Sequence, residues 1–486
     1  MVVILNEREA GMLPAGGILE QARKARDPRF DGRFFIAVRS TGIYCRPICP
    51  VKMPRAENVA FFESAAAASE AGYRPCLRCR PETAPGTPAW RGTSTTVTRA
   101  LKLIHEGALD ESNVSALSDR LVVTSRHLTR LFSQHLGASP NTVAQTRRLQ
   151  FAKKLIDETR LAMTDVAMIS GYGSVRRFND HFQKTYGRTP GSLRKAQVIS
   201  VGDVELKIAY RVPFHFDALL DFFRIRGIPG IEKVGDAYER SFFIDGQSGL
   251  LTVSDSGEGH LLCRVSGGSP RSLMSIVGRV RAMFDVDAVP EEISNVLSSD
   301  KSLRPLLKRA KGLRLPGAFD PFEVSVRAIV GQQVSVKGAT TVMGRIADLY
   351  GSDTGHGRIF PDPHRLAELD PGALPMPRKR AAAIREMSSR VAEGNLRFDM
   401  DDDEFYEILV SVPGIGPWTA QYVAMRALAD PDAFLHGDLV IKKVASELLG
   451  IDNEKALLAR AEHWRPWRGY AGMYLWRYAA ELSGTQ

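Results

Sequence analysis

The chain has 486 residues, of which 44% are hydrophobic and 25% are charged. These proportions are typical of a soluble globular protein, and the length predicts two to four domains. A net charge of +10 favours a polyanionic partner such as nucleic acid. The sequence contains no apolar run of the ~20 residues that a membrane span needs, and its first residues lack the basic region of a signal peptide. We therefore expect an intracellular protein with reduced cysteines and no membrane partner.

Two segments predict domain boundaries. Residues 81–96 are dense in Pro, Gly and Thr, and residues 187–203 end a helical region. They separate a cysteine-bearing head, a middle segment and a long C-terminal part. The middle segment has helical periodicity in VTRALKLIHEG and RRLQFAKKLIDE. The C-terminal part begins with a strand pattern, VELKIAY, continues with the hairpin pattern GLLTVSDSGEGHLLCRVSGG, and becomes helical after about residue 290.

Four of the five cysteines form two close pairs, Cys45-x3-Cys49 and Cys76-x2-Cys79, with twenty-six residues between the pairs. Two thiol pairs supply the four soft ligands of a tetrahedral site for one Zn²⁺. In a reducing compartment this pattern indicates metal binding or catalysis rather than disulfides. Spacing alone favours a structural site that helps a small domain to fold. The fifth cysteine, Cys263, lies in a strand pattern and is expected to be a small buried residue.

The sequence around these pairs reads FFIAVRSTGIYCRPICP, RAENVAFF and AGYRPCLRCRPE. It resembles the N-terminal domain of Ada, a bacterial methyl phosphotriester repair protein and regulator. The resemblance implies a zinc methyl-acceptor domain over residues 1–88. In that family the residue that corresponds to Cys45 accepts a methyl group from a DNA phosphotriester, and Cys49, Cys76 and Cys79 complete the zinc site.

The chemistry of such a head can be stated independently of the resemblance. Zinc keeps thiols deprotonated, and the thiolate is the nucleophile. Methylating one of four thiolates reduces the net charge of the site from near −2 to near −1. At 4 Å that unit of charge is worth about 1 kcal/mol in water and about 4 kcal/mol at an effective dielectric of 20, so DNA affinity rises roughly ten- to several-hundredfold. We hypothesise that Arg46, Arg74 and Arg78 frame the phosphate; the alternative is solvated surface charge.

The segments SALSDRLVVTSRHLTRLFSQHLG and DVAMISGYGSVRRFNDHFQKTYG each predict a short helix, a turn and a longer basic helix. This is the helix-turn-helix pattern, in which the second helix enters the major groove. GYGSVRRFNDHFQKTYGRTP resembles the AraC-type DNA-binding domain, which we place over residues 93–197. In the first turn Val122 occupies a position where glycine is common, whereas the second turn keeps Gly171, so we expect an altered first turn. The candidate DNA contacts are Ser125, Arg126, Thr129 and Arg130 on the first recognition helix and Ser174, Arg176, Arg177 and Asn179 on the second, about half of which are expected only to solvate their helix.

EFYEILVSVPGIGPWTAQYVAMRAL places Pro413, Gly414, Ile415 and Gly416 between two amphipathic helices, where glycines let the backbone approach a phosphate. FLHGDLVIKK follows and brings Asp438 toward the same helices. With RAIVGQQVSVKGA and WRPWRGYAGMYLW, these segments resemble the helix-hairpin-helix DNA glycosylases of the AlkA type. The resemblance implies an α+β subdomain over 200–290 and a helical glycosylase domain over 291–486. It makes Asp438 the catalytic residue that stabilises an oxocarbenium-like sugar cation; the alternative is a helix cap before LVIKK.

Lyase members of this superfamily carry a lysine just after the hairpin, where this chain has Trp418. Without that amine no Schiff base can form there, so we expect a monofunctional glycosylase. Trp418, Tyr422 and Trp476 match the aromatic lining of the AlkA base pocket, which attracts a cationic purine by about 0.5–2 kcal/mol. For Trp476 the alternative is core filling. Gln332 and Gln333 fall where AlkA inserts an apolar wedge into the gap left by a flipped base, and the polar Gln333 departs from that pattern.

The sequence therefore predicts a multidomain α+β protein: a small four-cysteine zinc domain, an all-α tandem helix-turn-helix, an α+β subdomain and a helical helix-hairpin-helix core. The resemblances imply methyl transfer from DNA phosphotriesters, transcriptional regulation and excision of alkylated purines of the 3-methyladenine type. They imply double-stranded DNA, both alkylated and promoter DNA, and RNA polymerase as partners, and a cytoplasmic, nucleoid-associated location. Two alternatives stay open. One is a transcription factor with structural zinc and a silent glycosylase fold; the other is a glycosylase whose head domains only increase DNA affinity.

Overall fold

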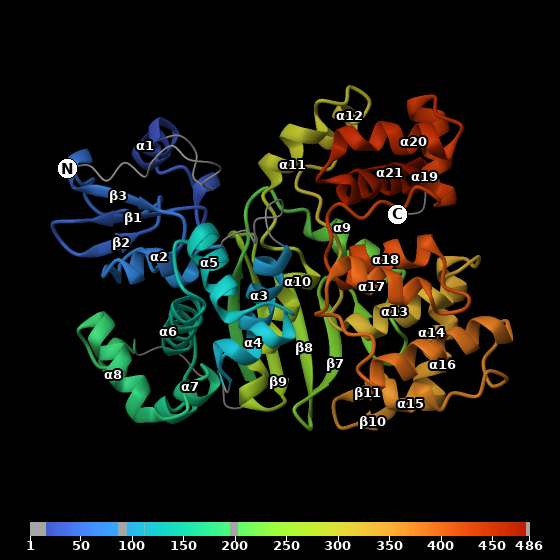
Figure 1. The fold of residues 1–486 in the computed structure, drawn as a ribbon, viewed down its shortest axis with the longest axis horizontal. Coiled ribbons are helices and arrows are strands. Elements are labelled where there is room, and N and C mark those ends of the chain that lie inside the picture. Colours follow the sequence, from blue (N-terminus) through green and yellow to red (C-terminus); the bar gives the residue numbers. More distant parts are fainter. Residues whose placement is uncertain (1–15, 86–94, 111, 195–202, 483–486) are drawn as a thin grey trace. The chain divides into compact units, whose positions relative to one another are not determined.

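The computed structural model describes residues 16–85, 95–110, 112–194 and 203–482 (Figure 1). The linkers expected at 81–96 and 187–203 lie partly outside these residues. By its internal contacts the chain divides into two compact units. The first comprises residues 1–154 and 171–194, and the second comprises 155–170 and 195–486.

The cysteine-bearing head of the first unit is a four-stranded sheet in the order β3-β1-β2-β4, flanked by two helices. β1 pairs antiparallel with β2 and β3, whereas β2 and β4 run parallel. Phe34 and Ile36 belong to a buried cluster with Leu19 of the first helix. The elements are α1 (Gly16–Ala25), β1 (Phe35–Val38), β2 (Ile43–Cys45), β3 (Val59–Phe62), α2 (Ala65–Glu70) and β4 (Arg74–Pro75).

The middle segment is entirely helical. Leu128 and Phe132 are four residues apart on one helix and form one buried cluster with Leu103 and Leu117 from the two preceding helices. Its helices are α3 (Thr95–His105), α4 (Val114–Arg120), α5 (Ser125–Leu136), α6 (Pro140–Glu158), α7 (Met163–Ile169) and α8 (Val175–Tyr186).

The two turns of this segment share one backbone feature. Val122, between α4 and α5, has a φ of 56°, and Gly171, after α7, has a φ of 80°. Both residues are therefore left-handed, a conformation that is unfavourable for a β-branched side chain. The expected alteration of the first turn is wrong in this respect, because Val122 keeps the left-handed geometry and exposes 78% of its surface.

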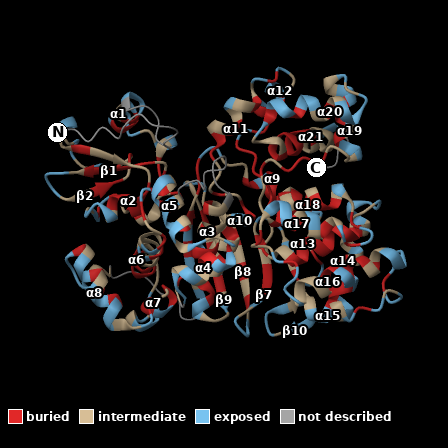
Figure 2. Cartoon of the chain, viewed as in Figure 1, coloured by how far each residue is buried: buried red, intermediate tan, exposed pale blue. Residues whose placement is uncertain are grey.

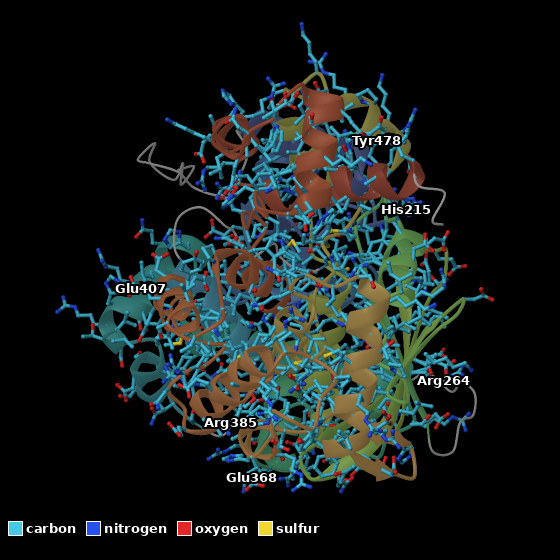
Figure 3. All side chains as sticks on the ribbon, turned by 90° about the vertical axis from the view of Figure 1, so that its right-hand side faces the viewer. His215, Arg264, Glu368, Arg385, Glu407 and Tyr478 are labelled. Carbon is cyan, nitrogen blue, oxygen red and sulfur yellow. The ribbon has the colours of Figure 1, made fainter. Side chains whose placement is uncertain are left out.

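From residue 203 onward the second unit contains a five-stranded antiparallel sheet in the order β5-β9-β8-β7-β6. The predicted strand and hairpin are confirmed as β5, β8 and β9. Cys263 of β9 is completely buried, while its neighbour Arg264 projects from the opposite face of the sheet (Figure 3). The elements are β5 (Asp203–Ala209), α9 (Phe216–Arg224), β6 (Glu232–Val234), β7 (Tyr238–Ile244), β8 (Gln247–Asp255), β9 (His260–Gly267) and α10 (Leu273–Met283).

The remainder of the second unit is a helical bundle around α13, whose residues 322–330 are all buried (Figure 2). A helix that is buried on all sides lies at the centre of its bundle. Its helices are α11 (Pro290–Leu297), α12 (Arg304–Arg309), α13 (Pro321–Val330), α14 (Val336–Tyr350), α15 (Pro363–Ala367), α16 (Arg378–Ala392), α17 (Asp402–Val410), α18 (Pro417–Ala427), α19 (Leu439–Val444), α20 (Glu454–Ala461) and α21 (Arg468–Leu482), and a small hairpin joins β10 (Ser352–Thr354) to β11 (Gly357–Ile359). None of the described helices combines the length and apolarity needed to cross a membrane.

Candidate metal centre and active site

The four cysteines of the head converge at the ends of two neighbouring strands. Because β2 and β4 run parallel, with Tyr44 opposite Pro75, Cys45 at the end of β2 lies beside Cys76, which directly follows β4. The backbone N–H of Cys76 donates to Tyr44 O at 3.0 Å, which fixes this register. All four sulfur atoms lie within 4.8 Å of one another and are buried. A tetrahedral Zn–S distance of about 2.3 Å separates sulfurs by about 3.8 Å, so the site fits one Zn²⁺.

Of the three arginines expected to frame a phosphate, Arg46 is turned into the head. Its Nε donates to Asp31 Oδ1 at 2.8 Å, and its Nη1 donates to Cys79 O at 3.2 Å and to Thr83 Oγ1 at 2.7 Å. This guanidinium thus ties the loop after Cys45 to the loop after Cys79. Arg74 and Arg78 are both exposed.

The head contacts the helical segment within the first unit. Lys153 of α6 lies 3.5 Å from Glu82 Oε1, and both side chains are almost fully buried. The hydroxyl of Ser64 donates to the carbonyl of Leu136, the last residue of α5, at 2.9 Å. The cysteine-bearing loops are therefore connected to the helices through buried polar contacts.

The recognition-helix candidates lie at the starts of α5 and α8. Thr124 accepts a hydrogen bond from His127 N, and Ser174 accepts one from Arg177 N, so both cap their helices. The remaining candidates split into the half-buried Ser125 and the exposed set Arg126, Thr129, Arg130, Arg176, Arg177 and Asn179. Exposed basic and amide side chains on the first two turns of these helices are suited to contacting DNA.

One carboxylate braces the turn before α8. Asp110 accepts from Arg148 Nε at 2.7 Å and from Arg147 Nη1 at 3.2 Å, both on α6. A Cβ on Gly171 would lie 2.4 Å from Asp110 Cγ. Gly171 is therefore required both by its left-handed backbone and by this close approach.

The predicted hairpin lies between α17 and α18. Gly414 has a φ of 95°, Ile415 is buried, and Pro413 is exposed. Gln332 Nε2 donates to Gly414 O and to Thr419 Oγ1, both at 2.9 Å. This contact holds the loop between α13 and α14 against the hairpin.

The neighbouring Gln333 is exposed and has a left-handed φ of 53°. Its side chain therefore stands at the surface of that loop, while the side chain of Gln332 is engaged with the hairpin. Backbone strain of this kind often accompanies a functional position.

Asp438 precedes α19 and is surrounded by donors. Its Oδ1 accepts from Val440 N at 3.0 Å, from Ile441 N at 3.1 Å and from Trp476 Nε1 at 3.0 Å. Its Oδ2 accepts from Trp418 Nε1 at 3.3 Å. The expected helix cap is present, and among the described residues Oδ2 accepts one hydrogen bond where Oδ1 accepts three, which leaves a lone pair of Oδ2 for a further group.

The aromatic candidates gather at this carboxylate. The rings of Trp418 and Tyr422 stack with centroids 5.5 Å apart and an interplanar angle of 20°. Trp476 is half-buried and its indole N–H points to Asp438, so the N–H end of Trp476 serves the carboxylate rather than the core. Burial alone would raise the pKa of Tyr422, but the guanidiniums of Arg426 and Arg226 and that of Arg327 lower it below its ordinary value.

Sequence reasoning missed Arg426, whose Nη1 donates to the Tyr422 hydroxyl at 2.7 Å. The available signal was its spacing, because residues four apart on a helix lie on one face. It also missed Asp31, Lys153 and Asp110, which contact residues distant in sequence and leave no local pattern.

Four protein families match successive parts of the chain. They are the metal binding domain of Ada over residues 19–82, a helix-turn-helix domain over 117–196, the AlkA N-terminal domain over 205–320 and the HhH-GPD superfamily of base excision DNA repair proteins over 326–469. The matches contain the four cysteines, both recognition helices, and the hairpin with Asp438.

Relatives match nearly the whole chain or its C-terminal part. The probable bifunctional transcriptional activator/DNA repair enzyme AlkA of Mycobacterium tuberculosis (strain CDC 1551 / Oshkosh) is 39% identical over 471 residues, covering 94% of this chain and 95% of the relative. DNA-3-methyladenine glycosylase 2 of Escherichia coli (strain K12) is 34% identical over 277 residues, covering 55% of this chain and 95% of that protein. Among solved structures, the 3-methyladenine DNA glycosylase from Archaeoglobus fulgidus covers 57% of this chain and 99% of its own, with a TM-score of 0.51 and 22% identity, a similarity of fold.

Proposed function

The chain belongs to the family of AlkA-type bifunctional transcriptional activators and DNA repair enzymes, and on that premise we propose that it repairs alkylated DNA by two separate chemistries. The second unit excises alkylated purines of the 3-methyladenine type. The head removes methyl groups from backbone phosphotriesters. The helix-turn-helix pair carries the response to promoter DNA.

The observation that carries the glycosylase proposal is the placement of Asp438 between two indole N–H groups. Oδ1 accepts from three donors and is held rigidly, whereas Oδ2 accepts from Trp418 and keeps room for a further group. When the bond between sugar and base breaks, its electron pair leaves with the base and the sugar becomes cationic. Asp438 Oδ2 stabilises that charge, water adds to the anomeric carbon, and a proton is lost to solvent.

The proposed glycosylase is monofunctional, because Trp418 occupies the position of the lyase nucleophile and offers no amine. An alkylated purine that is already cationic is a good leaving group, so the aromatic faces of Trp418 and Tyr422 need only hold it. Borohydride reduction during turnover should trap no covalent complex with DNA. A trapped complex would show that a lysine elsewhere forms a Schiff base.

In the head we propose Cys45 as the methyl acceptor. Cys45 and Cys49 border a shallow surface hollow that also includes Arg26 and Pro47, which gives a methyl phosphotriester a route to the sulfur. Bound Zn²⁺ would supply the thiolate form of the four cysteines. The Cys45 sulfur then forms a bond to the methyl carbon as the carbon–oxygen bond breaks, and the DNA regains a phosphodiester.

Methylation removes one negative charge from the four-cysteine cluster, which weakens repulsion of the DNA backbone. The buried contacts of Lys153 with Glu82 and of Ser64 with Leu136 support a head that acts on DNA together with α5. We propose that repair of the phosphotriester in this way raises promoter affinity, and that RNA polymerase is the partner recruited there.

The test is to incubate the zinc-loaded protein with duplex DNA that carries radiolabelled methyl groups. We expect label on the protein, lost in Cys45→Ser, and label released as free base, lost in Asp438→Asn. Label in only one fraction would reduce the other part to DNA binding. Label in neither fraction, from correctly folded protein, would contradict both activities.

A further inference from the structure

The hydroxyl of Tyr422 is anchored by a buried guanidinium. Arg426 Nη1 donates to Tyr422 Oη at 2.7 Å, and Arg426 Nη2 donates to Gly317 O at 2.9 Å. Arg426 exposes only 6% of its surface. Two hydrogen bonds in different directions leave this guanidinium little freedom, so it fixes the position of the Tyr422 hydroxyl.

This guanidinium is also held by aromatic contacts. It lies 4.8 Å from the ring centroid of Phe222, over which Arg226 stacks at 3.8 Å. Arg327 of α13 bonds to the carbonyl of Arg226 and to Thr340 Oγ1. The guanidiniums of Arg226, Arg327 and Arg426 all act on the Tyr422 hydroxyl and lower its pKa.

Arg426 lines a cavity that also contains two carboxylates, and both carboxylates already have partners. Glu323 pairs with Arg240 at 3.0 Å, and Glu232 accepts from the Tyr238 hydroxyl. The charged residues that line the cavity are Arg226, Glu232, Arg240, Glu323, Arg327 and Arg426. Four guanidiniums face two carboxylates, so the cavity has a cationic excess that favours an oxygen carrying negative charge.

We propose that Arg426 is a positioning residue of the base pocket, which holds the Tyr422 ring parallel to Trp418 through the Tyr422 hydroxyl. The inference rests on the proposed excision activity, because the stacked Trp418–Tyr422 pair is the surface that receives the base. A ring that rotates freely about its side-chain bonds would lose this stack. Loss of the hydroxyl contact should therefore slow the reaction.

A double-mutant cycle tests the inference with single-turnover excision of a methylated purine from duplex DNA. A hydrogen bond to a charged donor is worth about 1.5–3 kcal/mol when lost, which corresponds to a roughly ten- to hundredfold slower reaction. We expect Tyr422→Phe and Arg426→Met each to show that loss, and the double variant to show it only once. Tyr422→Phe keeps the bond from Arg426 to Gly317 and removes the contacts of the hydroxyl with Arg426 and with Arg226.

Tyr474→Phe is the matched control, because its buried hydroxyl donates to Ala310 O at 3.2 Å on another helix and should leave excision unchanged. If Arg426→Met fails to fold, Arg426→Lys keeps one donor for Tyr422 and should retain most activity. Additive losses, or wild-type rates in Tyr422→Phe, would overturn the inference.

A second readout does not depend on excision. The guanidiniums lower the pKa of Tyr422 below its ordinary value of 10.0, whereas burial raises the pKa of Tyr474 to about 12. In an alkaline absorbance titration of the whole protein, one tyrosine should ionise early, disappear in Tyr422→Phe and ionise at higher pH in Arg426→Met. If this signal is present but the wild type releases no base, the proposed function fails and the contact stands. If the signal is unchanged in Arg426→Met, the inference fails.

Discussion

Replacing Asp438 with Asn or with Ala separates its capping of α19 from its proposed chemistry. Asparagine retains the acceptor for Val440 N and Ile441 N and is as good a cap as aspartate, whereas alanine loses the cap at about 1 kcal/mol. Both variants lose the negative charge. A unit charge about 4 Å from the sugar cation is worth about 4 kcal/mol at an effective dielectric of 20, so excision should fall roughly a thousandfold in both.

The assay combines single-turnover release of methylated base with denaturant unfolding of the same preparations. We expect Asp438→Asn to be stable but inactive, and Asp438→Ala to be equally inactive and less stable. Asp362, which caps α15 by accepting from Arg365 N at 2.8 Å, provides the matched control. Asp362→Ala should lose a similar stability and keep its excision rate. Wild-type excision by Asp438→Asn would refute the reasoning and leave Asp438 as a cap only.

Three further predictions concern the first unit. Val122→Gly should raise the unfolding free energy of this unit by about 0.5–1 kcal/mol, because the left-handed strain of about 1–2 kcal/mol exceeds the entropy lost with glycine. Gly171→Val should lower the unfolding free energy by several kcal/mol, because its side chain would clash with Asp110. Calorimetry measures both changes, and equal effects would contradict the reasoning. Lys153→Met should destabilise the unit by about 3 kcal/mol because it removes one of the cations that compensate the buried Glu82, and Lys153→Arg should be much milder in the same measurement. Chelation of zinc should unfold the head, which limited proteolysis would detect. Base release should not slow, because Asp438 lies in the other unit. A parallel loss of excision would contradict the independence of the two units.

The zinc ligands could be predicted from the sequence because metal chemistry depends on residue type and short spacing. What spacing could not supply is the pairing of β2 with β4, which is parallel and joins residues about thirty positions apart. The hairpin and Asp438 were predictable for a similar reason, since they lie in one continuous stretch with distinctive glycines. The donors on Asp438 include Trp476, which only the packing of α21 brings to it.

Side chains with several possible partners were harder to predict. Arg46 follows Cys45 directly and has the side chain expected of a phosphate contact. In the structure its guanidinium instead binds Asp31, which lies fifteen residues earlier in the chain. Val122 shows the limit of residue preferences, because the packing of α4 and α5 imposes a left-handed backbone on a residue that disfavours it. The sequence shows Arg426 only as a residue four positions after Tyr422 on one helix, and the hydrogen bond between the two side chains is visible only in the structure.

The brace formed by Asp110 has a consequence for the choice of binding site on DNA. One carboxylate is bonded to two arginines of α6 and abuts the turn that leads into α8, so the second reading helix has a fixed offset from the helix that joins it to the first. Inserting one base pair between two contact sites moves the second site by about 3.4 Å and about a tenth of a helical turn. Two helices held at a fixed offset cannot adjust to that displacement, whereas two helices joined by a flexible linker could. We therefore expect Asp110 to fix the distance between the two DNA contact sites, and Asp110→Ala to broaden the set of operator spacings that the protein accepts.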